Sequence, residues 1–417
     1  MEEKIEFYKE IEFKDTEIGK IPKEWEVVKL DEVSIKIKAG GTPLTSKKEY
    51  YNGNIPFVKI EDMTRSYKYL RSTSTTITEA GLKNSNAWLV PANSLLVAIY
   101  ASIGVIAINT IEVTTNQAIL SVLPIEGKTN VEFLFYALTY LKPLLKKYTK
   151  ETTQKNLTGE IMKNFKVALP SLSEQQKITS ILSTVDESIQ KTDDIIAKTE
   201  RLKKGLMQEL LTKGIGHNEY VEIGIGKFPK DWKVVKLGNV ITYIKGKKPK
   251  RMTEEHQRGY FPYLSAEYLR NNEVTKFAEP SQDVILVKEG DLILLWDGSN
   301  AGEFFLGKQG ILSSTMVRIE QEKPSYDQKF LFYLLKAKEG FLKGQTKGTG
   351  IPHVNEDVLN NLVIPDPPLV EQRKISEILL TADEKLENLR RERTKLEKIK
   401  QWFMEELLTG RIRVRVT

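Results

Sequence analysis

Apolar and polar positions follow two different periods along this chain, and the two periods predict different elements. Short runs of β-branched and aromatic residues, bounded by Gly, Asn, Pro and Ser, predict strands. Apolar residues at steps of three and four predict helices. Together they indicate a mixed α+β fold. The expected strands in the first part of the chain are Val27–Leu30, Ile55–Ile60, Leu95–Ile99, Gly104–Ile108 and Ala118–Leu123, and the expected shorter helices are Val131–Lys147 and Phe330–Lys343.

Two long helices are predicted at 174–211 and 371–408. Ser173 and Gln176 have the spacing of a capping box at the start of the first helix, and Gly214 is a natural stop past its end. Apolar positions in both helices follow alternating steps of four and three, which is the heptad spacing of a coiled coil. We therefore expect the two helices to pack against each other; an amphipathic helix lying on its own domain is the alternative. The apolar seam positions are Ile178, Leu182, Val185, Ile189, Ile196, Leu206 and Leu210 in the first helix and Ile375, Leu379, Leu386, Leu389, Leu396, Phe403 and Leu407 in the second.

The chain contains two copies of one sequence pattern. The segment 18–33 recurs at 225–240, an offset of 207 residues, and 172–182 recurs at 369–379, an offset of 197. The offset changes within the first part of each copy, where loops must differ in length, and stays constant across the second part. Each copy therefore has a variable front followed by a rear that contains the long helix. The two fronts are 18–165 and 225–362, and Trp25 and Trp232, which recur at the same offset, are expected in their cores.

The amino-acid composition excludes several kinds of site. Cysteine is absent from the 417 residues, so the chain has no disulfide, no thiol nucleophile and no Cys-ligated metal. The three histidines, His217, His256 and His353, are scattered, which argues against a His-based metal site. Apolar residues make up 40% and charged residues 29%, a globular balance with enough apolar material for more than one core.

The charge is unevenly distributed. The net charge is +7, but 174–211 contains seven acidic and six basic residues and 371–408 contains nine of each, so the positive excess belongs to the fronts and tails. Such an excess is compatible with nucleic-acid binding. The N-terminal residues are charged, and the longest mostly apolar run, Leu95–Ile108, has 14 residues where a membrane span needs about 20. The sequence therefore predicts a cytoplasmic protein.

Motifs that would indicate catalysis are incomplete. Asp366–Pro368 resembles the base-binding loop of an adenine methyltransferase, but Leu369 follows where an aromatic ring is needed. Glu126–Lys128 has no aspartate closely upstream to complete the carboxylates of a metal-dependent nuclease. A Gly-rich loop for a cofactor is also lacking. The sequence therefore indicates a binding protein rather than an enzyme.

The fronts offer lysines, small residues and polar residues suited to phosphates and base edges. Small residues let the backbone approach a phosphate, and Lys and Arg neutralise it. The alternatives are a solvated basic loop, a helix cap or, for the aromatic residues, core packing. The candidates in the first front are Lys36, Lys38, Gly40, Gly41, Thr42, Lys59, Tyr100, Ser102, Thr152, Thr153, Gln154 and Lys155, and those in the second are Lys245, Lys247, Lys248, Lys250, Arg251, Trp296, Ser299, Lys347, Thr349 and His353.

The motif Pro-x-Leu-x-Glu-Gln-x-Lys-Ile at 170–178 and 367–375, each followed by a long helix that ends in Leu-Leu-Thr, resembles the specificity subunit of type I restriction–modification systems. The resemblance covers essentially the whole chain. It implies two target-recognition domains, each reading one half of a bipartite DNA sequence through the major groove, and two antiparallel spacer helices. The implied regions are a conserved N-terminal segment at 1–17, recognition domains at 18–165 and 225–362, a central conserved region at 166–214, a linker at 215–224 and a C-terminal conserved region at 363–417.

The same resemblance implies the partners. A specificity subunit has no catalysis and no cofactor of its own. It carries two methylation subunits, which methylate adenine with S-adenosylmethionine, and in the full complex restriction subunits, which cleave DNA with ATP and Mg²⁺. Because the two fronts differ, the implied double-stranded DNA target is asymmetric. Two other interpretations stay open: a specificity subunit of a type II-like system, and a coiled-coil scaffold that binds proteins instead of DNA.

Overall fold

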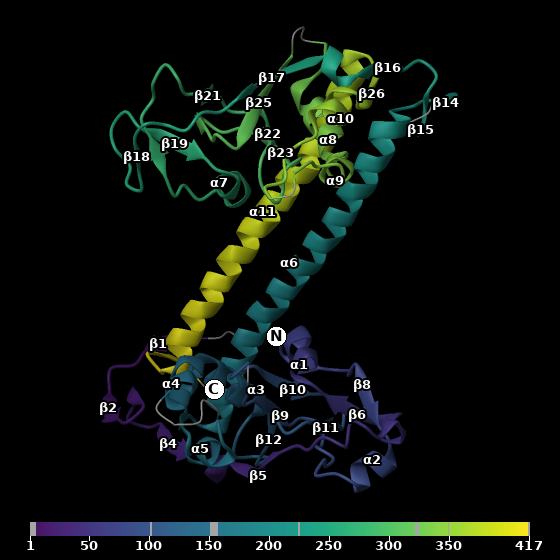
Figure 1. Cartoon of the computed structure of the whole chain (residues 1–417). Helices are drawn as coiled ribbons and strands as arrows, with labels where there is room; N and C mark the ends of the chain where they lie inside the picture. Colours follow the sequence, from purple (N-terminus) through teal and green to yellow (C-terminus); the bar gives the residue numbers. More distant parts are fainter. Residues whose placement is uncertain are drawn as a thin grey trace. The chain divides into compact units, whose positions relative to one another are not determined.

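The chain forms two compact units. Unit 1 consists of Met1–Thr192 and Glu392–Thr417, and unit 2 consists of Asp193–Arg391 (Figure 1). The division runs through the middle of both long helices, so each unit contains one front and one half of each helix. The structure, a computed structural model, describes residues 6–100, 102–150, 157–223, 226–321, 325–348 and 350–415.

The front of unit 1 contains a five-stranded sheet whose central strands are buried on both faces. In β9 (Leu95–Ala98), Leu95 and Val97 pack into the core that contains helix α3 (Val131–Tyr140), whereas Leu96 packs into a second core. A strand buried on both faces needs continuous apolar residues, which explains the run Leu-Leu-Val-Ala. The sheet order is β5 (Ser34–Ala39), β12 (Ile119–Pro124), β9, β10 (Ile106–Asn109) and β7 (Tyr69–Leu70), antiparallel except for β10 and β7.

The expectation of a single helix at 131–147 is wrong. This segment forms α3 and α4 (Lys142–Lys150), with Leu141 as the C-cap of α3. Pro143 explains the break, because proline has no backbone N–H and its ring collides with the carbonyl group four residues earlier. The other elements of this front are β2 (Phe13–Thr16), β3 (Gly19–Pro22), β4 (Glu26–Lys29), η1 (Leu30–Val33), η2 (Lys48–Tyr50), β6 (Tyr51–Val58), α1 (Ile60–Ser66), β8 (Thr75–Ile77), α2 (Glu79–Lys83), β11 (Thr114–Thr115), α5 (Gly159–Asn164) and β13 (Lys166–Leu169).

The front of unit 2 repeats this architecture. Its antiparallel sheet β17–β25–β22–β23 corresponds to β5–β12–β9–β10. The strand register agrees as well. Leu120 and Val317 are equivalent by the offset of 197 residues, and Leu120 pairs with Ala39 of β5 whereas Val317 pairs with Lys245 of β17. The four strands are β17 (Ile241–Lys245), β25 (Met316–Gln321), β22 (Leu292–Leu295) and β23 (Phe304–Leu306). A second sheet has the order β18 (Met252–Thr253), β20 (Phe277–Ala278), β19 (Phe261–Leu264), β24 (Gly310–Leu312) and β21 (Leu286–Val287).

The second expected shorter helix, 330–343, is also divided. It forms α8 (Gln328–Lys336) and α9 (Glu339–Lys343). At the start of α9 the carboxylate of Glu339 accepts a hydrogen bond from the backbone N–H of Phe304 at 2.7 Å, a contact with β23 that no local pattern reveals. The remaining elements of unit 2 are β14 (Tyr220–Ile223), β15 (Gly226–Pro229), β16 (Lys233–Lys236), η3 (Leu237–Asn239), α7 (Ala266–Asn271), α10 (Glu356–Asn360) and β26 (Val363–Asp366).

The five expected strands correspond to β4, β6, β9, β10 and β12, with shifted ends. Both long helices are present, α6 over Leu172–Lys213 and α11 over Leu369–Leu408. The expected capping box that starts at Ser173 is wrong. The hydroxyl of Ser171 caps α6 instead, because it accepts a hydrogen bond from the backbone N–H of Glu174 at 3.3 Å, and Ser173 lies inside the first turn. The predicted α+β fold with two long helices is confirmed.

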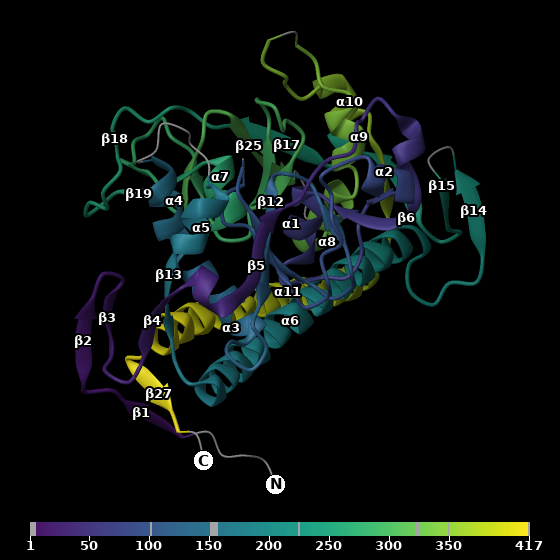
Figure 2. The same cartoon turned by 90° about the horizontal axis from the view of Figure 1, so that it is seen from below.

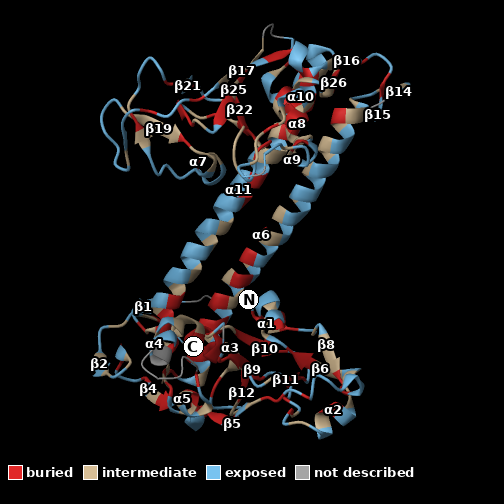
Figure 3. Cartoon of the chain, viewed as in Figure 1, coloured by how far each residue is buried: buried red, intermediate tan, exposed pale blue. Residues whose placement is uncertain are grey.

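The two long helices pack together antiparallel within each unit. In unit 1 Asp186 of α6 pairs with Lys400 of α11 at 2.7 Å, and in unit 2 Lys203 of α6 pairs with Asp383 of α11 at 2.5 Å. The apolar positions assigned to the seam from the heptad pattern are all buried or half-buried. Figure 3 shows buried and half-buried stretches along both helices, separated by exposed ones. Gly214, at a φ of +66°, ends α6 because glycine adopts this left-handed conformation at little cost.

Trp25 and Trp232 occupy equivalent core positions. Their side chains are 1% and 4% exposed, and each immediately precedes a strand, β4 or β16, instead of lying inside one. The indole N–H of Trp25 donates to Glu174 at 3.1 Å, and that of Trp232 donates to Glu371 at 3.0 Å. In each unit this hydrogen bond joins the start of the front to the start of a long helix.

The two ends of the described chain meet in unit 1. Strand β1 (Phe7–Lys9) pairs antiparallel with β27 (Ile412–Val414), and Figure 2 shows them side by side. Arg413 of β27 is largely buried and pairs with Glu174 and Glu10, each at 2.6 Å. The N-terminal and C-terminal segments therefore complete unit 1 together.

Candidate nucleic-acid interface

Lys36 and Lys38 lie on the same side of β5, because side chains two residues apart in a strand share a face. Their ammonium nitrogens lie 4.3 Å and 5.7 Å from the centre of the Trp88 ring. The indole N–H of Trp88 donates to the carbonyl oxygen of Ala39 at 3.1 Å, which holds the ring against the end of β5. Among the described residues no carboxylate pairs with either lysine. The pair is therefore a positive patch held by an aromatic ring.

The turn after β5 is built by close backbone contacts. A Cβ atom on Gly40 would lie 2.0 Å from the carbonyl oxygen of Thr115, so no larger residue fits there. The N–H groups of Gly40 and Gly41 donate to the carbonyl oxygens of Ile119 and Thr115 at 3.1 Å and 2.9 Å. These donors are consequently occupied, and the two glycines shape the turn instead of offering N–H groups to a phosphate. Thr42, which follows, is exposed.

The other candidates of the first front lie elsewhere on it. Lys59 is the exposed N-cap residue of α1, and Tyr100 and Ser102 are exposed around the turn that follows β9. Lys142 of α4 packs its side chain close to Gly104 of the same turn, where a Cβ atom would lie 2.8 Å from it. The candidates Thr152, Thr153, Gln154 and Lys155 lie outside the described residues.

In unit 2 the fold brings together candidates from three separate segments. The backbones of Lys347 and His353 exchange hydrogen bonds of 3.0 Å and 2.9 Å, and His353 also forms a bridge with Asp297. The Lys245 ammonium pairs with the Asp297 carboxylate at 2.9 Å. The carbonyl oxygen of Trp296 accepts a hydrogen bond from the N–H of Val354 at 2.9 Å, which fixes the same two loops together. Ser299 is exposed in this turn, and Thr349 lies outside the described residues.

The basic loop after β17 is exposed at each of its charged residues, Lys247, Lys248, Lys250 and Arg251. Lys250 lies 3.9 Å from Asp283, and Arg251 lies 3.8 Å from Glu279. Ion pairs this long between exposed side chains contribute little to the stability of the fold. The four cations therefore stay available to an anionic partner.

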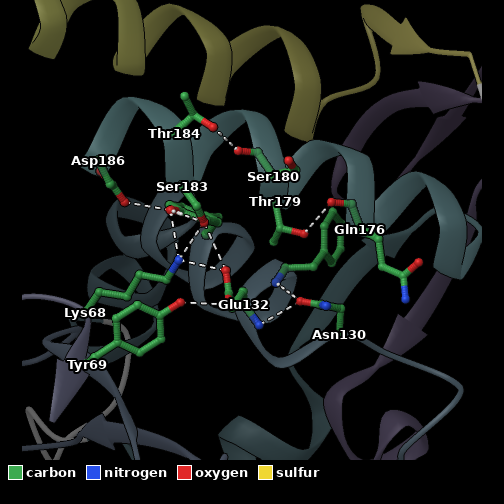
Figure 4. Close-up of polar contacts among 12 residues, drawn as sticks. Lys68, Tyr69, Asn130, Glu132, Gln176, Thr179, Ser180, Ser183, Thr184 and Asp186 are labelled. Carbon is green, nitrogen blue, oxygen red and sulfur yellow. Dashed lines mark hydrogen bonds and ion pairs between the residues drawn. The ribbon is translucent and has the colours of Figure 1, made fainter. Parts of the chain in front are cut away.

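A buried polar network attaches the first front to α6 within unit 1. Figure 4 shows the Lys68 ammonium, which contacts Glu132 and Ser183, each at 2.8 Å. Burial alone would raise the pKa of Glu132, but hydrogen bonds from Lys68 and Tyr69 outweigh it and hold that pKa below its ordinary value. The network fixes the front on the helix.

The same network continues to Asp186. The hydroxyl of Tyr136 donates to the Asp186 carboxylate at 2.6 Å, and burial together with that charge raises the pKa of Tyr136. Unit 2 repeats this contact, since Tyr333 donates to Asp383 at 2.7 Å. Both fronts are thus held on a long helix by a tyrosine and an aspartate at equivalent positions.

The repeated geometry agrees with one family. The sequence model described as "Type I restriction modification DNA specificity domain" matches the chain twice, over residues 22–201 and 229–398. The chain belongs to this family of type I restriction–modification specificity subunits. The resemblance stated from the sequence is confirmed.

Two relatives match along nearly the whole chain, and a third matches less than half of it. In Methanocaldococcus jannaschii, the type I restriction enzyme MjaIX specificity subunit is 26% identical over 98% of each chain, and the putative MjaX specificity subunit is 29% identical over 99% of each chain. The MjaVIII specificity subunit of the same organism is 52% identical, but that match spans 44% of this chain and 43% of the relative.

Solved structures support the fold. The crystal structure of a type I restriction–modification S subunit from M. genitalium superposes with a TM-score of 0.62 at 17% identity, covering 92% of this chain and 96% of that one. A chain from a structure of type I complex assembly superposes with a TM-score of 0.56 at 18% identity, covering 94% and 99%.

Two residues of this specificity subunit's surface were not found from its sequence. Trp88, which supports Lys36 and Lys38, follows a polar segment with no helical or strand period. Gln117 accepts a hydrogen bond from the Thr42 hydroxyl, although the two residues are 75 positions apart. The sequence signal available for Gln117 was the polar run between β11 and β12, in which this residue lies. Only the folded chain shows that this run lies beside the turn after β5.

Within the described ranges, no group of three His, Asp or Glu side chains is placed to hold a metal ion. Nor is any helix of those ranges long and apolar enough to cross a membrane.

Proposed function

We propose that this specificity subunit binds double-stranded DNA and selects an asymmetric bipartite target, each front reading one half. The proposal rests on one observation: the two fronts share one fold but present different side chains at their surfaces. In unit 1 Lys36 and Lys38 stand over Trp88 without an acidic partner in the described chain, whereas in unit 2 Lys245 is paired with Asp297. Unpaired lysines attract phosphates, and different loops read different bases, so the two halves of the target differ.

The proposal assigns catalysis to partner subunits. The incomplete methyltransferase and nuclease motifs of this chain support that division of labour. Two methylation subunits would supply S-adenosylmethionine-dependent methylation of adenine, and restriction subunits would supply cleavage with ATP and Mg²⁺. The paired helices α6 and α11 would set the number of base pairs between the two half-sites, because their length is fixed by their heptads.

Three measurements test the proposal. The purified full chain is titrated onto duplex DNA at several salt concentrations, and its methyl-transfer activity is assayed. The chain is also co-expressed with its methylation subunit in a host whose methylated adenines are then sequenced. We expect salt-dependent duplex binding, no methyl transfer by the chain alone, and one asymmetric bipartite motif with the partner.

Other results would favour the alternatives. Absence of salt-dependent retention on duplex DNA would favour a protein-binding scaffold. Recovery of a different catalytic chain as the stable partner would favour a type II-like system. A palindromic motif would contradict the assignment of unlike half-sites to the two fronts.

A further inference from the structure

The loop between β11 and β12 presents one side chain at its tip. The side chain of Asn116 accepts a hydrogen bond from the backbone N–H of Ala118 at 3.0 Å, and its backbone carbonyl oxygen accepts from the N–H of Ile119 at 3.2 Å. This arrangement is an Asx turn, which fixes the backbone of a short loop. Gln117, next to Asn116 in this turn, is exposed. Its position is therefore set by the turn while its side chain stays accessible.

Among the described residues, the side-chain amide of Gln117 is hydrogen-bonded through its oxygen and not through its nitrogen. Its Oε1 accepts a hydrogen bond from the hydroxyl of Thr42. Its Nε2 has no partner among the described residues, so both N–H groups are unpaired donors. A side chain oriented from within the protein loses less conformational entropy when it binds a ligand. Gln117 is thus a pre-oriented hydrogen-bond donor.

The positive patch lies on the same part of the front. Trp88 is hydrogen-bonded to Ala39, two residues before Gly41, and Gly41 packs so closely on Asn86 that a Cβ atom would lie 2.4 Å from its carbonyl carbon. The backbone N–H of Gly41 donates to Thr115, two residues before Gln117. Segments 36–42, 86–88 and 115–117 therefore form one surface. We call it the Gln117 surface; it consists of Lys36, Lys38, Thr42, Trp88 and Gln117.

The equivalent surface of unit 2 has different chemistry. The strand register makes Gln117 equivalent to Ser314, because Leu120 and Val317 are equivalent in β12 and β25. By the same register Lys36 and Lys38 are equivalent to Thr242 and Ile244 in β17. The shared fold therefore does not require a glutamine or two lysines at these positions. These side chains distinguish one front from the other.

We propose that Gln117 reads a base edge in the half-site bound by the first front, with Thr42 as its positioning residue and Lys36 and Lys38 on neighbouring phosphates. The inference rests on the proposed DNA-binding function. The free N–H groups of Gln117 match acceptors in the major groove, which are N7 and O6 of guanine, N7 of adenine and O4 of thymine. Cytosine presents only an amino donor there and would be rejected.

The test compares three full-length variants in two ways. The first is selection of bound sequences from duplex DNA randomised in both half-sites. The second is the adenine-methylation motif that each variant produces together with the methylation subunit. Gln117→Ala removes the donors and should relax one position of one half-site, with affinity for the preferred sequence reduced about 5- to 100-fold. Gln117→Glu keeps the shape but presents only acceptors, so the preferred base should change to one with an amino donor, adenine or cytosine. Ser314→Ala, the matched control in unit 2, should leave that position unchanged.

A variant of Thr42 separates positioning from folding. Thr42→Val should weaken discrimination at the same base position, and Thr42→Ser, which keeps the hydroxyl, should restore it. All variants should melt at the wild-type temperature, since Thr42 and Gln117 are exposed. An unchanged motif and affinity for Gln117→Ala would overturn the inference while leaving DNA binding intact, and so would a loss of affinity that is uniform across all sequences. Failure of the wild-type chain to select any sequence would instead overturn the proposed function.

Discussion

Asp186 of α6 and Lys400 of α11 form an ion pair of 2.7 Å in unit 1, and the two side chains are only 9% and 14% exposed. Asp383 and Lys203 form the equivalent pair in unit 2 at 2.5 Å. In each pair the acid lies on one long helix and the base on the other. The aspartate also accepts a hydrogen bond from a tyrosine of the adjoining front, so the same carboxylate links both helices to the front.

We expect Lys400→Ala to destabilise the protein strongly. It leaves Asp186 as a buried charge without its cation, and removal of one partner of a buried pair costs about 3–5 kcal/mol. Equilibrium urea unfolding of the full chain measures the change. Lys398→Ala, at an exposed position of the same helix, is the matched control and should change the unfolding midpoint little. Equal effects of the two variants would contradict a stabilising role of the pair.

The stability contributed by Glu132 should depend on pH. Its pKa in the folded protein is held below the ordinary value by Lys68 and Tyr69, so its contribution is complete above pH 4.5 and is lost as the pH falls through the folded pKa. Glu132→Gln should therefore destabilise the protein at pH 7, and the difference from wild type should shrink in acid. Chemical unfolding at pH 7 and at several pH values below 4.5 measures it. Glu61→Gln, an exposed change in the same unit, is the matched control and should change the free energy of unfolding little at pH 7.

We expect the loop after β17 to supply sequence-independent attraction. Replacing Lys247, Lys248 and Lys250 together by Ala should weaken binding to every duplex. It should also flatten the plot of log affinity against log salt by up to ~0.9 for each phosphate that the loop no longer neutralises. Anisotropy titrations at several salt concentrations measure both quantities. The methylation motif should stay the same, because phosphate contacts carry no base information.

The control for this loop removes the same charge from another exposed site of unit 2. Lys227, Lys230 and Lys233 lie in and beside the hairpin β14–β15, and their triple replacement by Ala should leave the salt slope closer to wild type. Equal slopes for the two triple variants would show that only net charge matters. In that case the loop has no direct contact with phosphates.

The paired helices should set the number of base pairs between the two half-sites. Deleting Ser188–Asp194 together with Lys385–Arg391 removes one heptad from each helix and keeps the seam in phase. It also leaves the residues of the Asp186–Lys400 and Lys203–Asp383 pairs in place. Each helix becomes ~10 Å shorter, so the gap in the methylation motif should shorten by about three base pairs, at ~3.4 Å each.

The bases read within each half-site should not change in this variant. A matched deletion of five residues from each helix breaks the heptad phase and should cost stability, because seam residues that remain, such as the buried Leu182 and Leu379, would fall out of phase with the seam residues beyond the deletion. An unchanged gap after the seven-residue deletion, or altered bases within a half-site, would show that the helices do not set the spacing.

The sequence predicted the elements whose signals are local or repeated. The heptad spacing that includes Ile178 and Leu379 specified two long helices over almost their full length, because a regular period persists for about ten turns. It failed where one residue changes the local outcome. Pro143 divides an otherwise continuous apolar helix, and Ser171 caps α6 in place of Ser173 because its hydroxyl is the one that reaches a free N–H group.

The candidate interface was predicted in part. Lys36, Lys38 and Lys245 were candidates because lysines neutralise phosphates, and the fold places them in equivalent strands. That His353 meets Asp297, and that Gln117 meets Thr42, could not be predicted, because those contacts join segments 56 and 75 residues apart through the pairing of strands. Sequence by itself thus determined the repeat, the two helices and the family resemblance, all of which are periodic or self-similar along the chain. Tertiary structure alone decided which loops share a surface, because strand register and close glycine contacts bring distant segments together.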